Sequence, residues 1–148
     1  HYIAQKSFED VSRHEFGSRA WLDNADEIQH PLNEMLMQCY QAVILNEAGD
    51  EPNDYFQTAV TIDAALDSDY YSRPEELCAR AFEAFVQDAS IKNNFLVKGT
   101  KESEEAKVGL YPKGEHRIRI NQAFRVYFMN LGGALKKNAS RSEQGAGQ

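Results

Sequence analysis

A helix start in the second half of the chain is the feature that most constrains the fold. Ser72 and Glu75 have the S-x-x-E spacing of a capping box, and Pro74 stands in the first turn. Apolar side chains then recur at i, i+4, i+7, i+8 and i+11, namely Cys78, Phe82, Phe85, Val86 and Ala89. This spacing predicts an amphipathic helix over 73–89 with that stripe in the core.

A line of charged side chains occupies another face of the same predicted helix. Glu76, Arg80 and Glu83 lie at i, i+4 and i+7, close enough to pair. If exposed, each pair contributes only about 0.3–0.5 kcal/mol. If Arg80 is buried, its guanidinium instead donates to backbone carbonyls and anchors loops. We favour this structural role over a catalytic pair of carboxylates.

The order of short segments around this helix resembles a known domain. The segments are YSRPEEL (71–77), ARAFEAFV (79–86), NFLV (94–97) and YPKGE (111–115). They resemble the large polyvalent protein-associated domain, type 1, of bacteriophages and conjugative elements, over residues 55–131. The resemblance implies a mobile-element origin and a role in conflict between invading DNA and its host. It does not by itself imply a catalytic reaction.

Other periodic segments predict a mainly α fold. The spacing of the apolar residues between Leu32 and Val43 predicts a helix over 31–47, after Pro31, and a second helix is expected over 56–66. Residues 14–24 are expected to form a short helix or turn. The stripe from Ile120 to Leu131 predicts a last helix, ended by Gly132 and Gly133.

The remaining segments complete a prediction of one compact domain. Residues 95–97 are at most a minor extended segment, and 98–109 are expected to be an exposed loop. We expect a single helical domain of four or five helices over residues 1–133 and a disordered tail over 134–148.

Composition and cysteine usage favour a cytoplasmic globular protein. The 148 residues are 42% hydrophobic and 26% charged, which is ordinary for one soluble domain. No apolar run approaches the roughly 20 residues of a membrane span, and no basic segment followed by an apolar core marks a signal peptide in these residues. Cys39 and Cys78 both fall on apolar helix faces, so we expect free thiols and not a disulfide.

Negative charge is concentrated in the middle of the chain. Residues 47–76 contain nine acids and one base, Arg73, in a chain of net charge −7. Spaced carboxylates on a helical scaffold can imitate a phosphate backbone, and neighbouring tyrosines can anchor an interface. The residues expected to bind a partner are Asp54, Tyr55, Asp63, Asp67, Asp69, Tyr70 and Tyr71. The expected partner is a host protein or nucleoprotein complex, such as a CRISPR effector or a restriction enzyme, which the protein would inhibit.

Positive charge is concentrated at the other end. Residues 113–148 contain seven bases and two acids, and Arg117, Arg119 and Arg125 lie near tyrosines in the sequence. Bases interleaved with aromatic residues suit contact with nucleic acid. A pI of about 5.1 argues against tight binding of this kind. Direct nucleic-acid binding is therefore not favoured.

A degenerate zinc motif supplies the alternative function. His14 and Glu15 begin the H-E-x-x-H spacing of zinc peptidases, but Ser18 stands where the second histidine would bind the metal. A third ligand would have to be a carboxylate such as Glu76 or Glu83. Because a hydroxyl is a poor zinc ligand, we expect no metal or other cofactor and favour a non-enzymatic protein. A degenerate zinc-peptidase-like hydrolase, or an accessory module of a polyvalent protein, remains the alternative.

Overall fold

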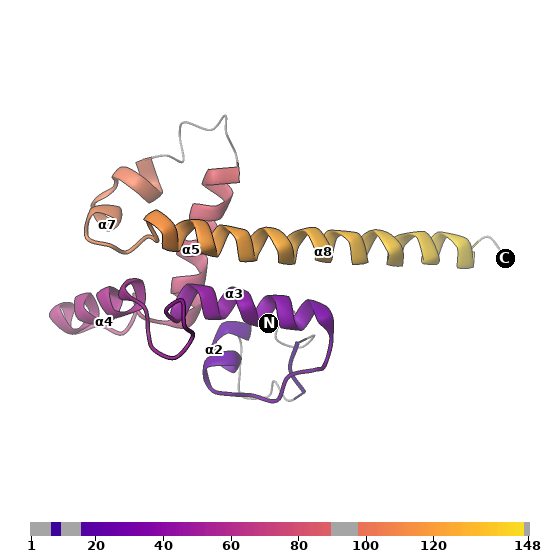
Figure 1. The fold of residues 1–148 in the computed structure, drawn as a ribbon, viewed down its shortest axis with the longest axis horizontal. Coiled ribbons are helices and arrows are strands. Elements are labelled where there is room, and N and C mark those ends of the chain that lie inside the picture. The colour runs from indigo at the N-terminus through magenta and orange to yellow at the C-terminus, as the bar shows by residue number, and fades with distance from the viewer. Residues whose placement is uncertain (1–6, 10–15, 90–97, 147–148) are drawn as a thin grey trace.

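The structure, a computed structural model, describes residues 7–9, 16–89 and 98–146, and this part of the chain is mainly α-helical (Figure 1). The elements are α2 (Gly17–Leu22), α3 (Pro31–Ile44), α4 (Asp54–Leu66), α5 (Pro74–Ala89), a π-helical turn η1 (Lys98–Glu102), α7 (Glu104–Lys107) and α8 (Gly114–Ala146). No strand occurs in the described ranges, where extended pairing is limited to two isolated bridges, Phe8 with Glu27 and Leu45 with Pro52. The predicted mainly α fold is confirmed.

The core lies where α3 and α8 run side by side in opposite directions and α5 crosses them (Figure 1). Helix α3 buries Leu36, Cys39, Tyr40, Val43 and Ile44. Helix α8 buries Ile120, Phe124 and Tyr127 against them. Burial of these side chains is the main stabilising term of the fold. None of the described helices is long and apolar enough to cross a membrane.

Sequence signals located the helix starts well. Helix α3 begins at Pro31, and the His30 ring nitrogen Nδ1 caps it by accepting the amide of Leu32 at 3.0 Å. Asn53 caps α4 in the same way, because its side chain accepts the amide of Phe56 at 2.8 Å. Helix α5 begins at Pro74, as the sequence predicts.

The face that α5 buries differs from the predicted one. The buried residues are Leu77, Arg80, Ala81, Ala84 and Gln87, besides Pro74. The stripe through Phe82 and Val86 is partly exposed. The small side chains of Ala81 and Ala84 let α5 approach the other helices closely. The large aromatic residues therefore lie at the rim, where the Phe82 ring is 5.4 Å from that of Phe128.

The predicted end of the last helix at Gly132 and Gly133 is wrong, because α8 continues to Ala146. A glycine ends a helix when it adopts a left-handed backbone, and neither of these two has a positive φ. Residues 136–145 are all exposed, and this part of α8 projects from the compact part of the molecule (Figure 1). Disorder of the 134–148 tail in solution stays a prediction.

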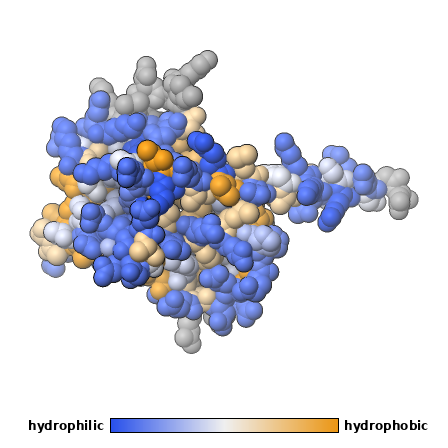
Figure 2. Space-filling view, viewed as in Figure 1, coloured by the Kyte–Doolittle hydropathy of each residue, from blue (hydrophilic) through white to orange (hydrophobic). Residues whose placement is uncertain are grey.

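Residues 98–109 are not simply an exposed loop. They contain η1 and α7, and the Ser103 hydroxyl caps α7 by accepting the amide of Ala106 at 3.2 Å. The extended segment expected at 95–97 lies outside the described residues, as do His14 and Glu15. Figure 2 shows hydrophilic and apolar side chains mixed over the compact part and mostly hydrophilic ones along the projecting part of α8.

Candidate partner-binding surfaces

The predicted binding residues of the acidic region do not share one environment. Asp54, Asp67, Asp69 and Tyr70 are exposed, and Tyr71 is half-buried. Tyr55 is buried, and its hydroxyl donates to the Leu77 carbonyl at 2.9 Å. Burial raises the pKa of Tyr55, so the hydroxyl stays a donor at neutral pH. Tyr55 therefore joins α4 to α5 and is not available to a partner.

Asp63 is also part of the fold, with only 4% of its surface exposed. Its carboxylate accepts the amides of Tyr71 at 3.0 Å and Ser72 at 2.7 Å. Burial alone would raise the pKa of Asp63, but hydrogen bonds from Ser72, Tyr71 and Ser68 outweigh it and hold the pKa below its ordinary value. Asp63 thus fixes the turn between α4 and α5. Ser72 serves this turn and does not form the predicted capping box with Glu75.

Arg80 has the structural role that we favoured from the sequence. It is buried, its Nε donates to the Leu110 carbonyl at 2.8 Å, and its Nη2 donates to the Tyr71 carbonyl at 2.6 Å. Glu83 accepts the Tyr111 hydroxyl at 2.9 Å. Glu76 pairs with the Tyr70 hydroxyl, and this hydrogen bond raises the pKa of Tyr70. The three residues thus hold the turn at 70–71 and the segment at 110–111 on α5, with Arg80 bonded to both, and no ion pair forms among them along the helix.

The exposed carboxylates gather at the two ends of α4. Glu47, Asp50, Glu51 and Asp54 lie at its start, and Asp67 and Asp69 at its end. Since α4 has 13 residues, the two groups are roughly 20 Å apart. The large exposed apolar side chains of the same segment are Val60 and Leu66 on α4 and Tyr70 just after it. We call these nine residues the acidic α4 surface.

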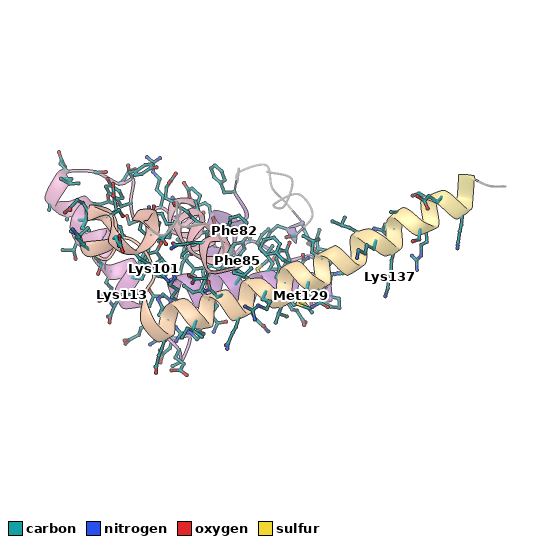
Figure 3. All side chains as sticks on the ribbon, turned by 90° about the horizontal axis from the view of Figure 1, so that it is seen from above. Phe82, Phe85, Lys101, Lys113, Met129 and Lys137 are labelled. Carbon is teal, nitrogen blue, oxygen red and sulfur yellow. The ribbon has the colours of Figure 1, made fainter. Side chains whose placement is uncertain are left out.

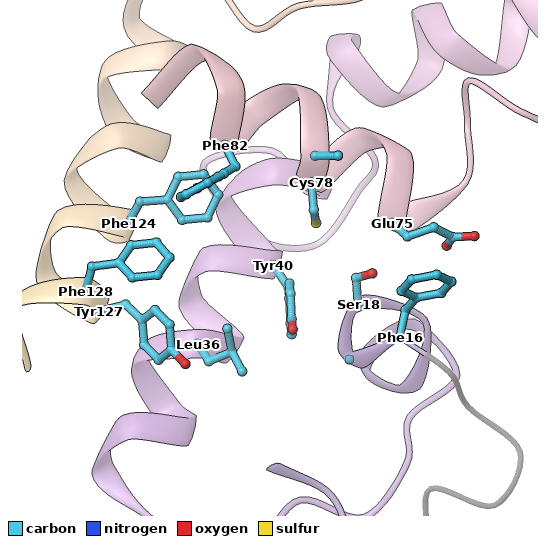
Figure 4. Close-up of a pocket in the computed structure, with 12 residues that line it drawn as sticks. Phe16, Ser18, Leu36, Tyr40, Glu75, Cys78, Phe82, Phe124, Tyr127 and Phe128 are labelled. Atoms are coloured by element: carbon cyan, nitrogen blue, oxygen red, sulfur yellow. The ribbon is translucent and has the colours of Figure 1, made fainter. Parts of the chain in front are cut away.

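A second surface feature is an apolar pocket of about 590 Å³ between α2, α3, α5 and α8 (Figure 4). Its walls include Leu36 and Tyr40 of α3, Phe82 of α5, and Phe124 and Phe128 of α8. We call it the aromatic pocket. The sequence alone does not indicate this pocket, because its spacing predicts that the stripe through Phe82 lies in the core.

Ser18 and Glu75 lie at the α2 end of the aromatic pocket (Figure 4). The Glu75 oxygen Oε2 is shielded from solvent and accepts no hydrogen bond. Its nearest cation is the Arg19 Nη2, at 4.0 Å. Glu76 and Glu83, the carboxylates predicted as third metal ligands, do not line this pocket. The described residues contain no group of three or more potential metal ligands.

The two cysteines are free, as predicted, and neither is set up as a nucleophile. Burial raises the pKa of Cys39 to about 12. Burial likewise raises the pKa of Cys78, at the aromatic pocket, to about 12. Both side chains are therefore neutral thiols at physiological pH.

The basic region does not present a row of free arginines. Arg117 is buried, and its Nε and Nη2 donate to the two carboxylate oxygens of Asp88 at 2.7 and 2.9 Å. Its Nη1 donates to the carbonyls of Thr100 and Pro112, both at 3.3 Å. Arg117 thereby joins α8, α5 and η1. It is not available to bind a nucleic-acid phosphate.

Comparison with known proteins identifies the family. No curated protein and no solved structure matches the chain. The family profile of large polyvalent protein-associated domain 1 matches residues 62–135, which is half of the chain. The matched range includes Asp63, which fixes the turn before α5, and Arg80 and Arg117, which hold loops on α5 and α8. This chain belongs to the large polyvalent protein-associated domain 1 family.

Proposed function

We propose that this chain is a non-enzymatic binding protein of a phage or other mobile element, active in the host cytoplasm against a defence system. The acidic α4 surface would occupy a basic groove on a host protein or nucleoprotein complex, such as a CRISPR effector or a restriction enzyme. The observation that supports this proposal is the set of exposed carboxylates at both ends of α4. Arg73, which pairs with Asp69 at 2.8 Å, is the one base among residues 47–76.

The carboxylates and the apolar side chains of the acidic α4 surface would have different roles in binding a partner. Uncompensated carboxylates increase the rate of encounter with a basic partner and orient it. Leu66 and Tyr70, which are exposed, supply apolar area that a partner can bury, at roughly 25 cal/mol for each Å². A partner that binds both carboxylate groups must present bases roughly 20 Å apart. A strip of phosphate-binding side chains meets this requirement.

The test is a capture from bacterial lysate with paired charge reversals. Glu51→Lys with Asp69→Lys reverses one charge at each end of α4, and it avoids Asp67, whose left-handed backbone disfavours lysine. The control, Glu102→Lys with Glu105→Lys, makes the same change in net charge on exposed residues of η1 and α7. We expect recovery of a nuclease or CRISPR effector subunit that the first pair abolishes and the control preserves. Equal loss with both pairs, or an affinity that does not change with salt, would refute the proposal.

A metal-dependent hydrolase is the second candidate, and one observation favours keeping it. Ser18 occupies the second ligand position of the H-E-x-x-H spacing, and it lines the same pocket as Glu75, whose Oε2 accepts no hydrogen bond. Metal analysis of untagged protein tests this candidate directly. Stoichiometric Zn²⁺ in the wild-type protein would support it, and metal-free protein would remove it.

A further inference from the structure

The apolar stripe of α8 continues past the part of the molecule that covers it. Phe124, Phe128, Leu131 and Leu135 recur at i, i+4, i+7 and i+11. Exposure is 7% at Phe124 and 37% at Phe128, Leu131 packs in part against the core, and Leu135 beyond it is 58% exposed. The chain's own α3 and α5 therefore cover the start of the stripe and leave its continuation open.

The aromatic pocket adjoins the point where the stripe becomes exposed. Phe124 and Phe128 form one wall of it, and Phe82 completes the aromatic cluster (Figure 4). Figure 3 shows Phe82 and Phe85 beside the middle of α8, and Lys137 on its projecting part. The pocket and the open stripe thus form one continuous apolar surface.

Charge indicates what kind of segment fits this surface. The Glu75 Oε2 atom in the pocket accepts no hydrogen bond, and its ion pair with Arg19 Nη2 is long, at 4.0 Å. The projecting part of α8 carries Lys136, Lys137 and Arg141 against Glu143, in a chain of net charge −7. The pocket therefore suits a segment in which an apolar side chain is followed by a base. Helix α8 contains such a segment in Leu135, Lys136 and Lys137.

The projecting helix also lacks support from its own chain. A segment of about a dozen residues is marginally helical in water, and Gly132 and Gly133 weaken it further. A Cβ atom added to either glycine would have no neighbouring atom within 4 Å in a single chain, so the space beside both glycines is open. Two helices that cross at these glycines can approach closely.

We propose that two copies of this chain pair through α8 in antiparallel orientation, crossing near Gly132. Leu135 of one copy then lies opposite Phe128 of the other, over the aromatic pocket. Lys136 or Lys137 supplies the cation for Glu75, and the two-fold symmetry repeats the contact. This pairing uses a surface separate from α4, so its failure would not affect the proposed function.

The first test is mass in solution by light scattering over a range of concentrations. We expect twice the chain mass for the wild-type protein and a monomer for Leu135→Asp. The matched control is Ile118→Asp, because Ile118 is also 58% exposed on α8 but lies outside the stripe. Circular dichroism checks that both variants fold. A wild-type monomer at every concentration, or a dimer that both variants leave intact, would overturn the proposal.

The second test measures the direction of pairing by cysteine cross-linking under mild oxidation. Leu131→Cys lies next to the proposed crossing and should form a disulfide between copies. Ala139→Cys lies two turns away, so in an antiparallel pair its two copies are far apart and should not cross-link. Wild-type protein, with Cys39 and Cys78 alone, gives the background. Efficient cross-linking of Ala139→Cys would indicate parallel helices and contradict the proposal.

The third test is a charge exchange. Lys136→Glu with Lys137→Glu should weaken the dimer, and adding Glu75→Lys should restore it at least in part. Glu75→Lys also makes the double variant less negative, from a net charge of −11 to −9, starting from −7 in the wild type. The matched control is therefore Glu47→Lys in the double variant, which changes the net charge equally on the separate α4 surface and should not restore the dimer. A triple variant that is weaker than the double variant would contradict the proposed contact.

Discussion

The Asp63 carboxylate holds the turn between α4 and α5. Replacing Asp63 with alanine tests how much this side chain contributes to the stability of the fold. The carboxylate accepts two backbone amides, those of Tyr71 and Ser72. In Asp63→Ala both amides lose their acceptor. A buried donor without an acceptor costs about 1–3 kcal/mol. Because both amides are only part-buried, water restores some of this loss, and we expect Asp63→Ala to lower the free energy of unfolding by roughly 2–4 kcal/mol.

The assay is urea unfolding followed by circular dichroism, with thermal melting as a second measurement. For a chain of this size, each 1 kcal/mol corresponds to about 2–4 °C in Tm, so the melting temperature should fall by roughly 5–15 °C. The control is Asp69→Ala, which removes an exposed carboxylate near the same turn, paired only with Arg73. That variant should change stability by less than about 1 kcal/mol. Equal effects of the two substitutions would refute the role assigned to Asp63.

The stability that Asp63 contributes should also depend on pH. The pKa of Asp63 is held below its ordinary value in the folded state. A carboxyl group with a depressed pKa contributes stability above its unfolded pKa, which is about 3.9. That contribution is lost as the pH falls through the folded pKa. The stability difference between wild type and Asp63→Asn should therefore be constant near neutral pH and shrink below about pH 4.

Three further predictions concern α5 and α8. Arg117→Ala leaves Asp88 and the carbonyls of Thr100 and Pro112 without their donor. It should therefore lower the free energy of unfolding, measured in urea, by about 3 kcal/mol. An effect no larger than that of Arg125→Ala would contradict this prediction. Arg80→Lys cannot reach the Leu110 and Tyr71 carbonyls together, so we expect a loss of about 1–2 kcal/mol, measured in the same way. Gly132→Ala with Gly133→Ala should raise the helix content measured by circular dichroism. Gly109→Ala should instead lower the free energy of unfolding, because Gly109 has a φ of +90° and an added Cβ would lie 3.1 Å from Thr58. A loss of helix content in the first variant, or a gain in stability in the second, would refute the backbone conformations assigned to these glycines.

Local signals in the sequence predict α3, α4, α5 and the first part of α8, but they miss η1, α7 and the extension of α8, and they do not determine which face each helix buries. Helix α3 has one apolar face, and the spacing predicts the buried residues Leu36, Cys39, Tyr40 and Val43. Met37 and Ile44 are buried as well, which the spacing does not predict. Helix α5 has two candidate faces, one with Phe82 and Phe85 and one with Leu77, Ala81 and Ala84. Hydrophobicity favours the first face, but close packing against α3 and α8 selects the second. That choice depends on the space between helices, which one sequence does not specify.

The same limit explains why the acidic region was only partly interpreted. In the sequence, Asp63 is one acid among nine between residues 47 and 76. What distinguishes it is the turn that places the amides of Tyr71 and Ser72 around it. Gly132 and Gly133 were interpreted as a helix end for a related reason. Glycine permits a left-handed backbone, but the structure does not require one there.

Glu75 has two competing interpretations, and substitutions of Glu75 and Ser18 separate them. Its Oε2 atom is buried without a hydrogen bond, and Arg19 Nη2 approaches it only to 4.0 Å. This burial costs free energy unless a ligand or a partner supplies a closer cation. If a second copy supplies it, Glu75→Gln should weaken the dimer, and Ser18→His should acquire no metal. If Glu75 instead stands where a metal ligand would be, Ser18→His should bind Zn²⁺, and Ser18→His with Glu75→Gln should not.

The two measurements are solution mass and zinc content, both made on untagged protein. A Glu75→Gln protein with unchanged mass, together with zinc binding by Ser18→His, would favour the metal interpretation. A weakened dimer and metal-free Ser18→His would favour the partner's lysine. If Glu75→Gln changes neither quantity and raises the melting temperature, the carboxylate serves neither purpose. In that case the buried Glu75 carboxylate only destabilises the fold, and core packing offsets its desolvation free energy. Glu75→Gln then stabilises the protein, because it removes the buried charge without removing a favourable interaction.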